Sequence, residues 1–292
     1  MLQFENINMK KSQPIYYVNG KYLPKNEAKI NVDDLGLLRG YGVFDYLVTY
    51  QGGRPFLIKK HIKRLYNSAR LIDLRISYKP SFIEKLVIRT INKNKNGEEK
   101  AVRIVITGGE SENAISPAKK STIIISVNTR KMFSESFYKN GATVITFDFK
   151  RESPQTKSLN YIQAVKANAL AKIKGAVEAI YVDKENNKLF EGTTSNVFLV
   201  KNRKIVTPDG QTLPGITREM VMKICRKFYP TTMRDVEIKE LLSADEIFLS
   251  SSNKEIMPVV KVDNKIIGNG VPGEITNKIR SEFRKFIDQG NW

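Results

Sequence analysis

The sequence has very few residues that could act through a thiol or an imidazole. Cys225 is its one cysteine and His61 its one histidine. An internal disulfide is therefore excluded, and the composition argues against a Ser–His–Asp or Cys–His hydrolase and against a metal site. Cys225 lies in the apolar helical pattern "EMVMKICRKF" and is expected to be an inert core residue. His61 opens "HIKRL" and is expected to support the structure or a neighbouring catalytic group.

Long apolar runs are also missing. No segment could span a bilayer, and residues 1–14 are polar, unlike a signal sequence. A Walker motif and a dinucleotide-binding fingerprint are absent as well. We expect a cytoplasmic location and no membrane partner, and the chemistry that remains is that of lysine or carboxylate groups.

Positive charge is abundant but dispersed. The net charge is +19, with acids interspersed among the bases and no dense basic arm or aromatic-interleaved basic stretch. Nucleic-acid binding relies on clustered bases that neutralise phosphates, so a basic nucleic-acid-binding protein is only a remote alternative. We interpret the charge as a solvated, lysine-rich surface that attracts anionic small molecules.

The first half of the chain predicts a compact α+β unit. "PIYYVNGKYLP" predicts a hairpin around Asn19-Gly20, because both residues tolerate positive φ. Residues 43–50 predict a strand, "QGGR" a turn and "PFLI" its partner. Helical spacing from Ile62 to Ile72 and over residues 81–92 predicts two helices, and "AVRIVIT" and "STIIISV" predict two strands.

The apolar periodicity lapses between residues 128 and 141, which predicts a linker over about 129–140. We therefore expect a two-domain α+β protein, with a small domain over 1–133, a boundary near Phe133 and a larger domain over 134–292.

The second half predicts a β-rich domain with helices around it. Strands are expected at "ATVITFDF", "EAIYVD", "KLFEG", "SNVFLV", "KIVTP" and "EIFLSS", with a hairpin at "IMPVVKVDNKIIG". Helices are expected from about Thr217 and Glu274. A further helix ends at Gly175, and its apolar face is expected to carry Ile162, Val165, Ala169, Leu170 and Ile173.

Two stretches could carry lysine chemistry. A lysine that forms an imine needs a neutral amine, which desolvation or a nearby cation favours. In "QTKSLNY", Lys157 follows a turn-like stretch and precedes an apolar helix, where its side chain could point inward. In "LFEGTTSNVFLV", Glu191 lies among apolar residues at a strand end, a costly place for an unpaired acid. Local pattern alone does not distinguish Lys157 from the other lysines.

Several separated motifs, in order, resemble one family over almost the whole chain. They are "RGYGVFDY", "HIKRL", "KSLNY", "EGTTSNVF", "LPGITRE" and "SSSNKEIMPV". Together they are similar to the fold-type IV aminotransferases, which use pyridoxal 5'-phosphate and include branched-chain and D-amino-acid aminotransferases and aminodeoxychorismate lyase. The resemblance implies a small N-terminal α/β domain and a larger C-terminal pseudo-barrel β domain with helices.

The resemblance also implies roles for individual residues. Lys157 would form the internal aldimine and then move the proton between the substrate α-carbon and the cofactor. Glu191 would keep the pyridine nitrogen protonated, and Tyr161, on the same face as Lys157 if the helix has begun, would contact the phenolic oxygen.

For the cofactor phosphate, the resemblance points to Arg64 and to the helix start in "LPGITRE", with Leu213, Ile216 and Thr217. Ser195, Asn196, Ser251 and Ser252 are expected to complete the cofactor pocket.

On the substrate side, the resemblance implies Arg39, Phe44, Tyr46 and Arg103. Strand alternation places Phe44 and Tyr46 on one face and Asp45 on the other. Arg39 and Arg103 could bind the α-carboxylate, while an internal salt bridge is an equal alternative for Arg103. The chain departs from orthodox D-amino-acid enzymes at Gly108 and Glu110 and from branched-chain enzymes at Ala101. The preference for L or D substrates therefore stays open.

The leading hypothesis is an aminotransferase that moves an amino group from an amino acid to a 2-oxo acid. An aminodeoxychorismate lyase-like enzyme is the alternative. The resemblance further implies a homodimer, in which Arg39 could serve the pocket of the other chain.

Overall fold

The computed structural model describes residues 13–292, and its first half is built on one antiparallel sheet. The strand order is β2-β1-β6-β5-β3-β4. The bounds are β1 (Ile15–Val18), β2 (Lys21–Pro24), β3 (Gly42–Tyr50), β4 (Arg54–Pro55), β5 (Lys100–Thr107) and β6 (Thr122–Thr129). The predicted hairpin at Asn19-Gly20 is confirmed, since these residues have φ of 43° and 99° between β1 and β2.

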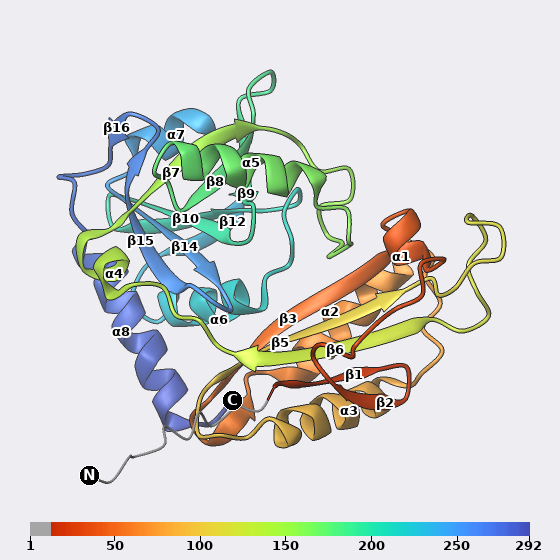
Figure 1. Cartoon of the computed structure of the whole chain (residues 1–292). Helices are drawn as coiled ribbons and strands as arrows, with labels where there is room; N and C mark the ends of the chain where they lie inside the picture. The colour runs from red at the N-terminus through yellow and green to blue at the C-terminus, as the bar shows by residue number, and fades with distance from the viewer. Residues whose placement is uncertain (1–12) are drawn as a thin grey trace, which may run out of the picture.

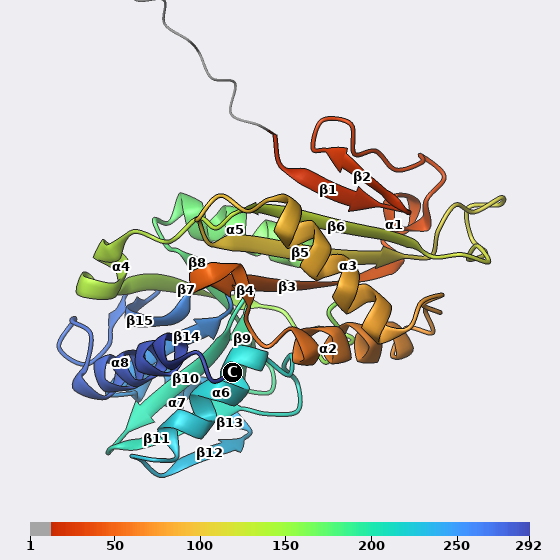
Figure 2. The same cartoon turned by 90° about the horizontal axis from the view of Figure 1, so that it is seen from below.

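Helices α2 (Ile58–Arg70) and α3 (Pro80–Lys93) cover one face of this sheet, as Figure 2 shows. Short helices α1 (Leu35–Leu38) and η1 (Gln51–Gly53) flank β3. The expectation that "PFLI" pairs as a strand is wrong beyond Pro55. Leu57 adopts a left-handed φ of 48° and α2 begins at Ile58, because the chain must turn sharply from the sheet edge.

The second half is built on a strongly curved mixed sheet, visible at the upper left of Figure 1. Its strand order is β12-β11-β10-β14-β15-β7-β8-β9-β13, with β16 paired to β15. The bounds are β7 (Ala142–Asp148), β8 (Glu178–Asp183), β9 (Lys188–Gly192), β10 (Asn196–Lys201), β11 (Lys204–Pro208), β12 (Thr231–Arg234), β13 (Val236–Glu237), β14 (Glu246–Ser251), β15 (Glu255–Val262) and β16 (Lys265–Ile266).

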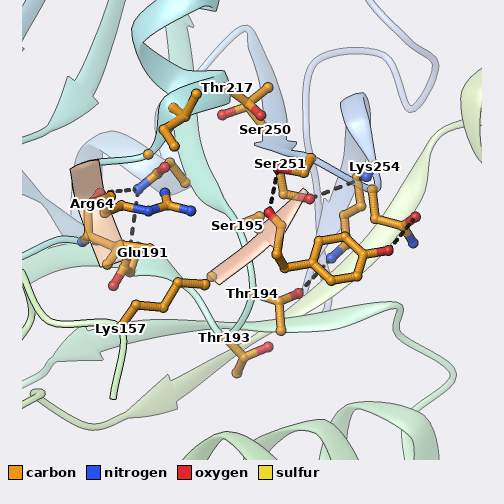
Figure 3. Close-up of a pocket in the computed structure, with 18 of the residues that line it drawn as sticks. Arg64, Lys157, Glu191, Thr193, Thr194, Ser195, Thr217, Ser250, Ser251 and Lys254 are labelled. Carbon is orange, nitrogen blue, oxygen red and sulfur yellow. Dashed lines mark hydrogen bonds between the residues drawn. The ribbon is translucent and has the colours of Figure 1, made fainter. Parts of the chain in front are cut away.

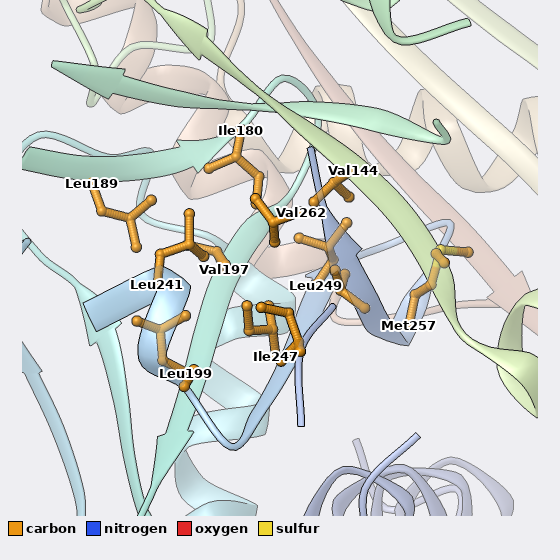
Figure 4. Packing of buried hydrophobic residues seen from close by; sticks show 14 of the residues in the cluster. Val144, Ile180, Leu189, Val197, Leu199, Leu241, Ile247, Leu249, Met257 and Val262 are labelled. Atoms are coloured by element: carbon orange, nitrogen blue, oxygen red, sulfur yellow. The ribbon is translucent and has the colours of Figure 1, made fainter. Parts of the chain in front are cut away.

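Alternate residues of these strands point into one interior core. Figure 4 shows Val144, Ile180, Val197, Leu249 and Met257 converging from five different strands, with Leu241 from a helix. Because side chains alternate along a strand, a core filled from so many strands requires the sheet to curl around it. The expected pseudo-barrel with surrounding helices is therefore confirmed. The helices are α4 (Glu135–Asn140), α5 (Ile162–Ile173), α6 (Ile216–Cys225), α7 (Ile238–Ser243) and α8 (Glu274–Gln289).

The predicted apolar face of α5 is correct at Leu170, which packs against the buried cluster, and wrong at its other positions. Ile162, Val165 and Ile173 are exposed, while Ala164, Ala167 and Ala171 are buried against β7 and β8. Small residues let the helix backbone approach the aromatic side chains of that sheet surface closely, so the larger apolar residues are left outside. The spacing of apolar residues could not identify the buried face, because the alanines also recur at helical spacing and form a second apolar face.

The chain passes from one sheet to the other between Thr129 and Ala142, and this segment contains α4, which the sequence pattern did not predict. The division into domains at Phe133 stays a prediction. The two halves share a core: Val48 and Tyr50 of β3 and Phe56 pack with residues of α6 and α8. No helix among residues 13–292 is long and apolar enough to cross a membrane.

Candidate active site

A cavity of about 340 Å³ is lined by residues of both halves of the chain. Figure 3 shows side chains from several elements converging on it. Of the site residues predicted from the sequence, those that line this cavity are Phe44, Tyr46, Arg64, Arg103, Lys157, Tyr161, Glu191, Ser195, Asn196, Leu213, Ile216, Thr217, Ser251 and Ser252. The fold thus gathers residues as far apart in the sequence as Phe44 and Ser252.

Arg39 is the predicted site residue that does not line this cavity. It lines a neighbouring cavity of about 660 Å³, and its Nη1 donates a hydrogen bond to the Leu38 carbonyl at 2.9 Å. Arg151 and Tyr161 line both cavities. A single chain therefore does not bring Arg39 to Lys157, and its role stays a prediction that involves a second chain.

Lys157 is held by the first sheet, although it belongs to the second half of the chain. Its carbonyl accepts a hydrogen bond from the Phe44 amide at 2.9 Å, and the Leu159 amide donates to the Gly42 carbonyl at 2.9 Å. Its own amide donates to Ser68 Oγ at 3.1 Å. These bonds fix the lysine backbone on β3 and direct its side chain over the Phe44 ring, with Nζ 4.7 Å from the ring centroid.

The amine of Lys157 is poised between its charged and neutral forms. Burial, followed by the positive charge of Arg64, lowers the pKa of Lys157 to about 7, while Asp45 and Glu191 act in the opposite direction. The side chain keeps some exposure, but that exposure is to the cavity. Near neutral pH a large fraction of this amine is therefore unprotonated and nucleophilic.

Arg64, on α2, is fixed by Asp45. Its Nε and Nη2 donate to the two carboxylate oxygens of Asp45 at 2.9 and 2.8 Å, and His61 Nδ1 lies 2.7 Å from Asp45 Oδ1. Asp45 and His61 are fully buried. Burial alone would raise the pKa of Asp45, but Arg64 and His61 hold it well below its ordinary range, so the carboxylate stays charged. The predicted supporting role of His61 agrees with this contact.

Glu191, on β9, is surrounded by donors. Its carboxylate accepts from Arg151 Nη1 at 2.9 Å, from the Leu213 amide at 2.9 Å and from Asn196 Nδ2 at 3.1 Å. Burial raises the pKa of Glu191, and Arg151 and the Leu213 amide oppose that effect. Arg151 also donates to the Thr156 carbonyl at 2.6 Å, so one guanidinium connects Glu191 to the segment that carries Lys157.

The N-terminus of α6 borders the cavity near Arg64. Gly215, Ile216 and Thr217 line the cavity there, and Gly215 offers no side-chain cap to the helix. A Cβ at Gly215 would collide with the Asn196 side chain, so this close approach requires glycine. Ser250 Oγ is buried, lines the cavity, and has no hydrogen-bond partner among the described residues. This region can accept an anion with several oxygen atoms.

Tyr161 precedes α5, which begins at Ile162, so the helical-face argument for its position does not hold. The residue nevertheless lines the cavity, with its ring 5.2 Å from that of Phe44 in an edge-on arrangement. Burial raises the pKa of Tyr161 to about 12, so its hydroxyl stays a proton donor.

Beside the Phe44 ring, the cavity also presents a group suited to a carboxylate. Phe44 and Tyr46 both line it while Asp45 points away, as strand alternation predicts. The Arg103 guanidinium lies 5.6 Å from the Phe44 ring centroid and forms no salt bridge with a carboxylate in the part of the chain that the structure describes. The alternative of an internal salt bridge for Arg103 is therefore not supported.

Several cavity residues were not found by sequence reasoning. Arg151 was missed because it lies in the irregular segment "KRESPQT", where periodicity carries no signal. Lys254 was missed because its buried partner Glu178, which does not itself line the cavity, is far from it in sequence. In the sequence, the one available signal for Lys254 was its position just after the serines of "SSSNKEI".

Known proteins resemble this chain in sequence and in fold. Residues 42–262 match the family model described as amino-transferase class IV. The chain is 34% identical to a provisionally named branched-chain-amino-acid aminotransferase of Methanocaldococcus jannaschii, over 92% of this chain and 94% of that protein. It is 29% identical to a D-alanine aminotransferase of Staphylococcus haemolyticus, over 93% and 97%.

Its fold resembles a T.th. branched-chain amino acid aminotransferase, solved with pyridoxamine 5'-phosphate, with a TM-score of 0.86, 26% identity and coverage of 94% and 93%. The chain therefore belongs to the class IV aminotransferases. Its relatives include enzymes named for branched-chain and for D-amino acids, and its activity is amino-acid transamination.

The lowered pKa of Lys157 predicts a specific pH dependence in the protein without cofactor. Below about pH 7 the amine is protonated and unreactive, and above it the neutral amine reacts fully. Labelling by an amine-reactive reagent, followed by peptide mass spectrometry, should show a midpoint near 7 at Lys157. Surface lysines, with an ordinary pKa of about 10.4, should label only at higher pH.

Arg64→Gln tests whether the positive charge of Arg64 contributes to the lowered pKa of Lys157. Removing this cation should move the Lys157 midpoint upward, because Arg64 lowers the pKa of the amine. A midpoint that stays in place or falls would contradict this account of the electrostatics.

Proposed function

We propose that this aminotransferase holds pyridoxal 5'-phosphate in the 340 Å³ cavity and attaches it through Lys157. The observation that carries the proposal is the convergence of a lysine with a lowered pKa, a buried acid and a fixed arginine on one cavity. The amino group then moves from an amino acid to a 2-oxo acid, as the family assignment implies.

The donor set fits this cofactor at both of its ends. Arg64, the α6 N-terminus and the unpartnered Ser250 hydroxyl suit a phosphate. Glu191, with its three donors, suits a protonated ring nitrogen, and Tyr161 suits a phenolic oxygen. Ser195, Asn196, Leu213, Ile216, Thr217, Ser251 and Ser252 complete the proposed cofactor pocket.

When bound, the cofactor supplies an aldehyde carbon and an electron-accepting ring. The side chains of the protein are proposed to supply the proton transfer and the contacts to the substrate. Lys157 Nζ, with a pKa near neutrality, can accept and return a proton at the substrate α-carbon. Arg103 is proposed to hold the substrate α-carboxylate, and Phe44 and Tyr46 to form the wall beside it.

Exposed apolar side chains support the proposal of a homodimer. Val32, Leu37, Ile115, Ile162 and Val165 are each more than 60% exposed. Ile115 and Ile162 line the 660 Å³ cavity together with Arg39. A second copy of the chain would bury this surface and could contribute Arg39 to the partner's pocket. A cytoplasmic location stays a prediction from the sequence.

Loss of the Lys157 amine should abolish turnover. Lys157→Ala is expected to lower kcat by about 10³-fold or more, since no other cavity group replaces both the attachment and the proton transfer. Lys265→Ala, a surface lysine on β16, is the control and should keep full activity. Full activity in Lys157→Ala would refute the proposed site.

A panel of L- and D-amino acids, each followed by the colour change of bound cofactor, would identify the donor.

Loss of the Asp45 charge should weaken cofactor binding without touching the cofactor. Asp45→Asn removes the bidentate anchor of Arg64, so the dissociation constant for pyridoxal 5'-phosphate should rise about tenfold or more. Titration of protein fluorescence measures this constant. Asp235→Asn, at an exposed ion pair, is the control. Unchanged affinity in a well-folded Asp45→Asn variant would show that Arg64 does not need this anchor.

A charge on the exposed apolar surface should break the proposed dimer. Ile162→Asp is expected to yield monomers in sedimentation experiments, because an interface would have to bury an unpaired carboxylate. Val271→Asp, at another exposed apolar residue outside this surface, should leave the assembly unchanged. A parent protein that sediments as an active monomer would contradict the homodimer.

A further inference from the structure

Lys254 is a buried cation that the proposed chemistry does not use. It lies in the turn between β14 and β15, is 5% exposed, and lines the cavity. Figure 3 shows it at the opposite end of the cavity from Arg64 and Glu191, with Thr194 and Ser195 between. It therefore belongs to the end of the cavity away from the proposed phosphate site.

The ammonium of Lys254 is paired with Glu178, a residue of β8 that is 1% exposed. Nζ lies 3.1 Å from Glu178 Oε2 and donates to Thr194 Oγ1 at 2.8 Å. Because both charges are buried, the loss of either one would leave the other uncompensated in a region of low polarity.

Glu178 also binds the whole of the segment 193–195. Its carboxylate accepts from Thr193 Oγ1 at 2.9 Å, from the Thr194 amide and hydroxyl, and from Ser195 Oγ at 2.7 Å. Burial opposes ionisation of this acid, but Lys254 and these donors lower its pKa. The carboxylate is thus a fixed centre around which the segment is folded.

The two cavity walls that meet here have little freedom to adjust. A Cβ on Gly192 would lie 3.0 Å from the Glu178 carboxyl carbon, so the segment is already in close contact with the acid. On the other wall, Arg130 Nη2 donates to the Asn253 carbonyl at 3.3 Å and to Glu255 at 2.9 Å. The turn is therefore held by Arg130 from the side of the first sheet, and Lys254 connects it to Glu178 of β8 and to Thr194.

We propose that the Lys254–Glu178 ion pair is a positioning device that holds segment 193–195 against the β14–β15 turn and so sets the width of the substrate end of the cavity. This inference rests on the proposed function of the cavity. The pair has no bond to Arg64 or to the N-terminus of α6, although Glu178 accepts a hydrogen bond from Ser195, a residue of the proposed cofactor pocket. Its loss should therefore affect the binding of amino acid and 2-oxo acid more than the binding of cofactor.

Lys254→Met tests the proposal in the cofactor-loaded enzyme, since methionine keeps much of the length of the side chain and removes its charge. We expect KM for the amino acid to rise at least about fivefold, with kcat changed less than about threefold. The dissociation constant for pyridoxal 5'-phosphate should stay within about twofold, as measured by fluorescence titration. A smaller rise in KM, or an equal loss of cofactor affinity, would overturn the proposal.

A double-mutant cycle separates positioning from general loss of stability. Glu178→Gln should raise KM as Lys254→Met does, and the double variant should be no worse than the worse single one, because neither charge is then left unpaired. Additive effects would overturn the proposal. If Lys254→Met fails to fold, comparison of Glu178→Gln with the double variant still tests the positioning role.

Lys100→Met is the matched control, since Lys100 is 4% exposed on β5 and does not line the cavity. It should leave KM unchanged even if it lowers the thermal midpoint. Lys157→Ala is the reference for the site itself. An active Lys157→Ala variant would refute the proposed function, whereas an inactive one with parental KM in Lys254→Met would refute only the positioning role.

Discussion

The structure depends on the placement of one amine beside a fixed guanidinium. Desolvation and a nearby cation each favour the neutral form of an amine near neutral pH, and both are costly in a folded protein. Arg64 supplies the cation, and the Asp45 carboxylate supplies the charge that allows Arg64 to lie there. His61 contacts the same carboxylate, so the one histidine of the chain belongs to this buried cluster.

The cavity is organised as a series of compensated charges contributed by distant elements. Glu191 is balanced by Arg151, and Glu178 by Lys254. The Arg151–Glu191 pair joins segments that secondary structure alone would not hold together, the irregular segment before Lys157 and strand β9. Buried ion pairs add little to net stability, but they penalise any arrangement that separates the partners. Here the two ion pairs fix the positions of the cavity walls relative to each other.

Much of this architecture could be predicted from the sequence, and the failures have physical causes. Strands with clear alternation, such as β5 and β6, and the Asn19-Gly20 hairpin were found because local chemistry determines them. The buried face of α5 was not, because alanines and larger apolar residues form competing stripes and only the sheet surface decides between them. The chemistry of Lys157 came from motifs in combination. Arg151, which pairs with Glu191, lies in irregular chain, where no pattern points to it.

The backbone of Lys157 is bonded to strand β3, whereas Glu191 belongs to the second sheet. The distance between the Lys157 amine and the Glu191 carboxylate therefore depends on how the two halves of the chain pack against each other. A molecule that must touch both residues at once works as a clamp between the halves, and its binding energy adds to the cohesion of the whole chain. Binding of such a molecule in the cavity should therefore also stabilise the packing of the two halves.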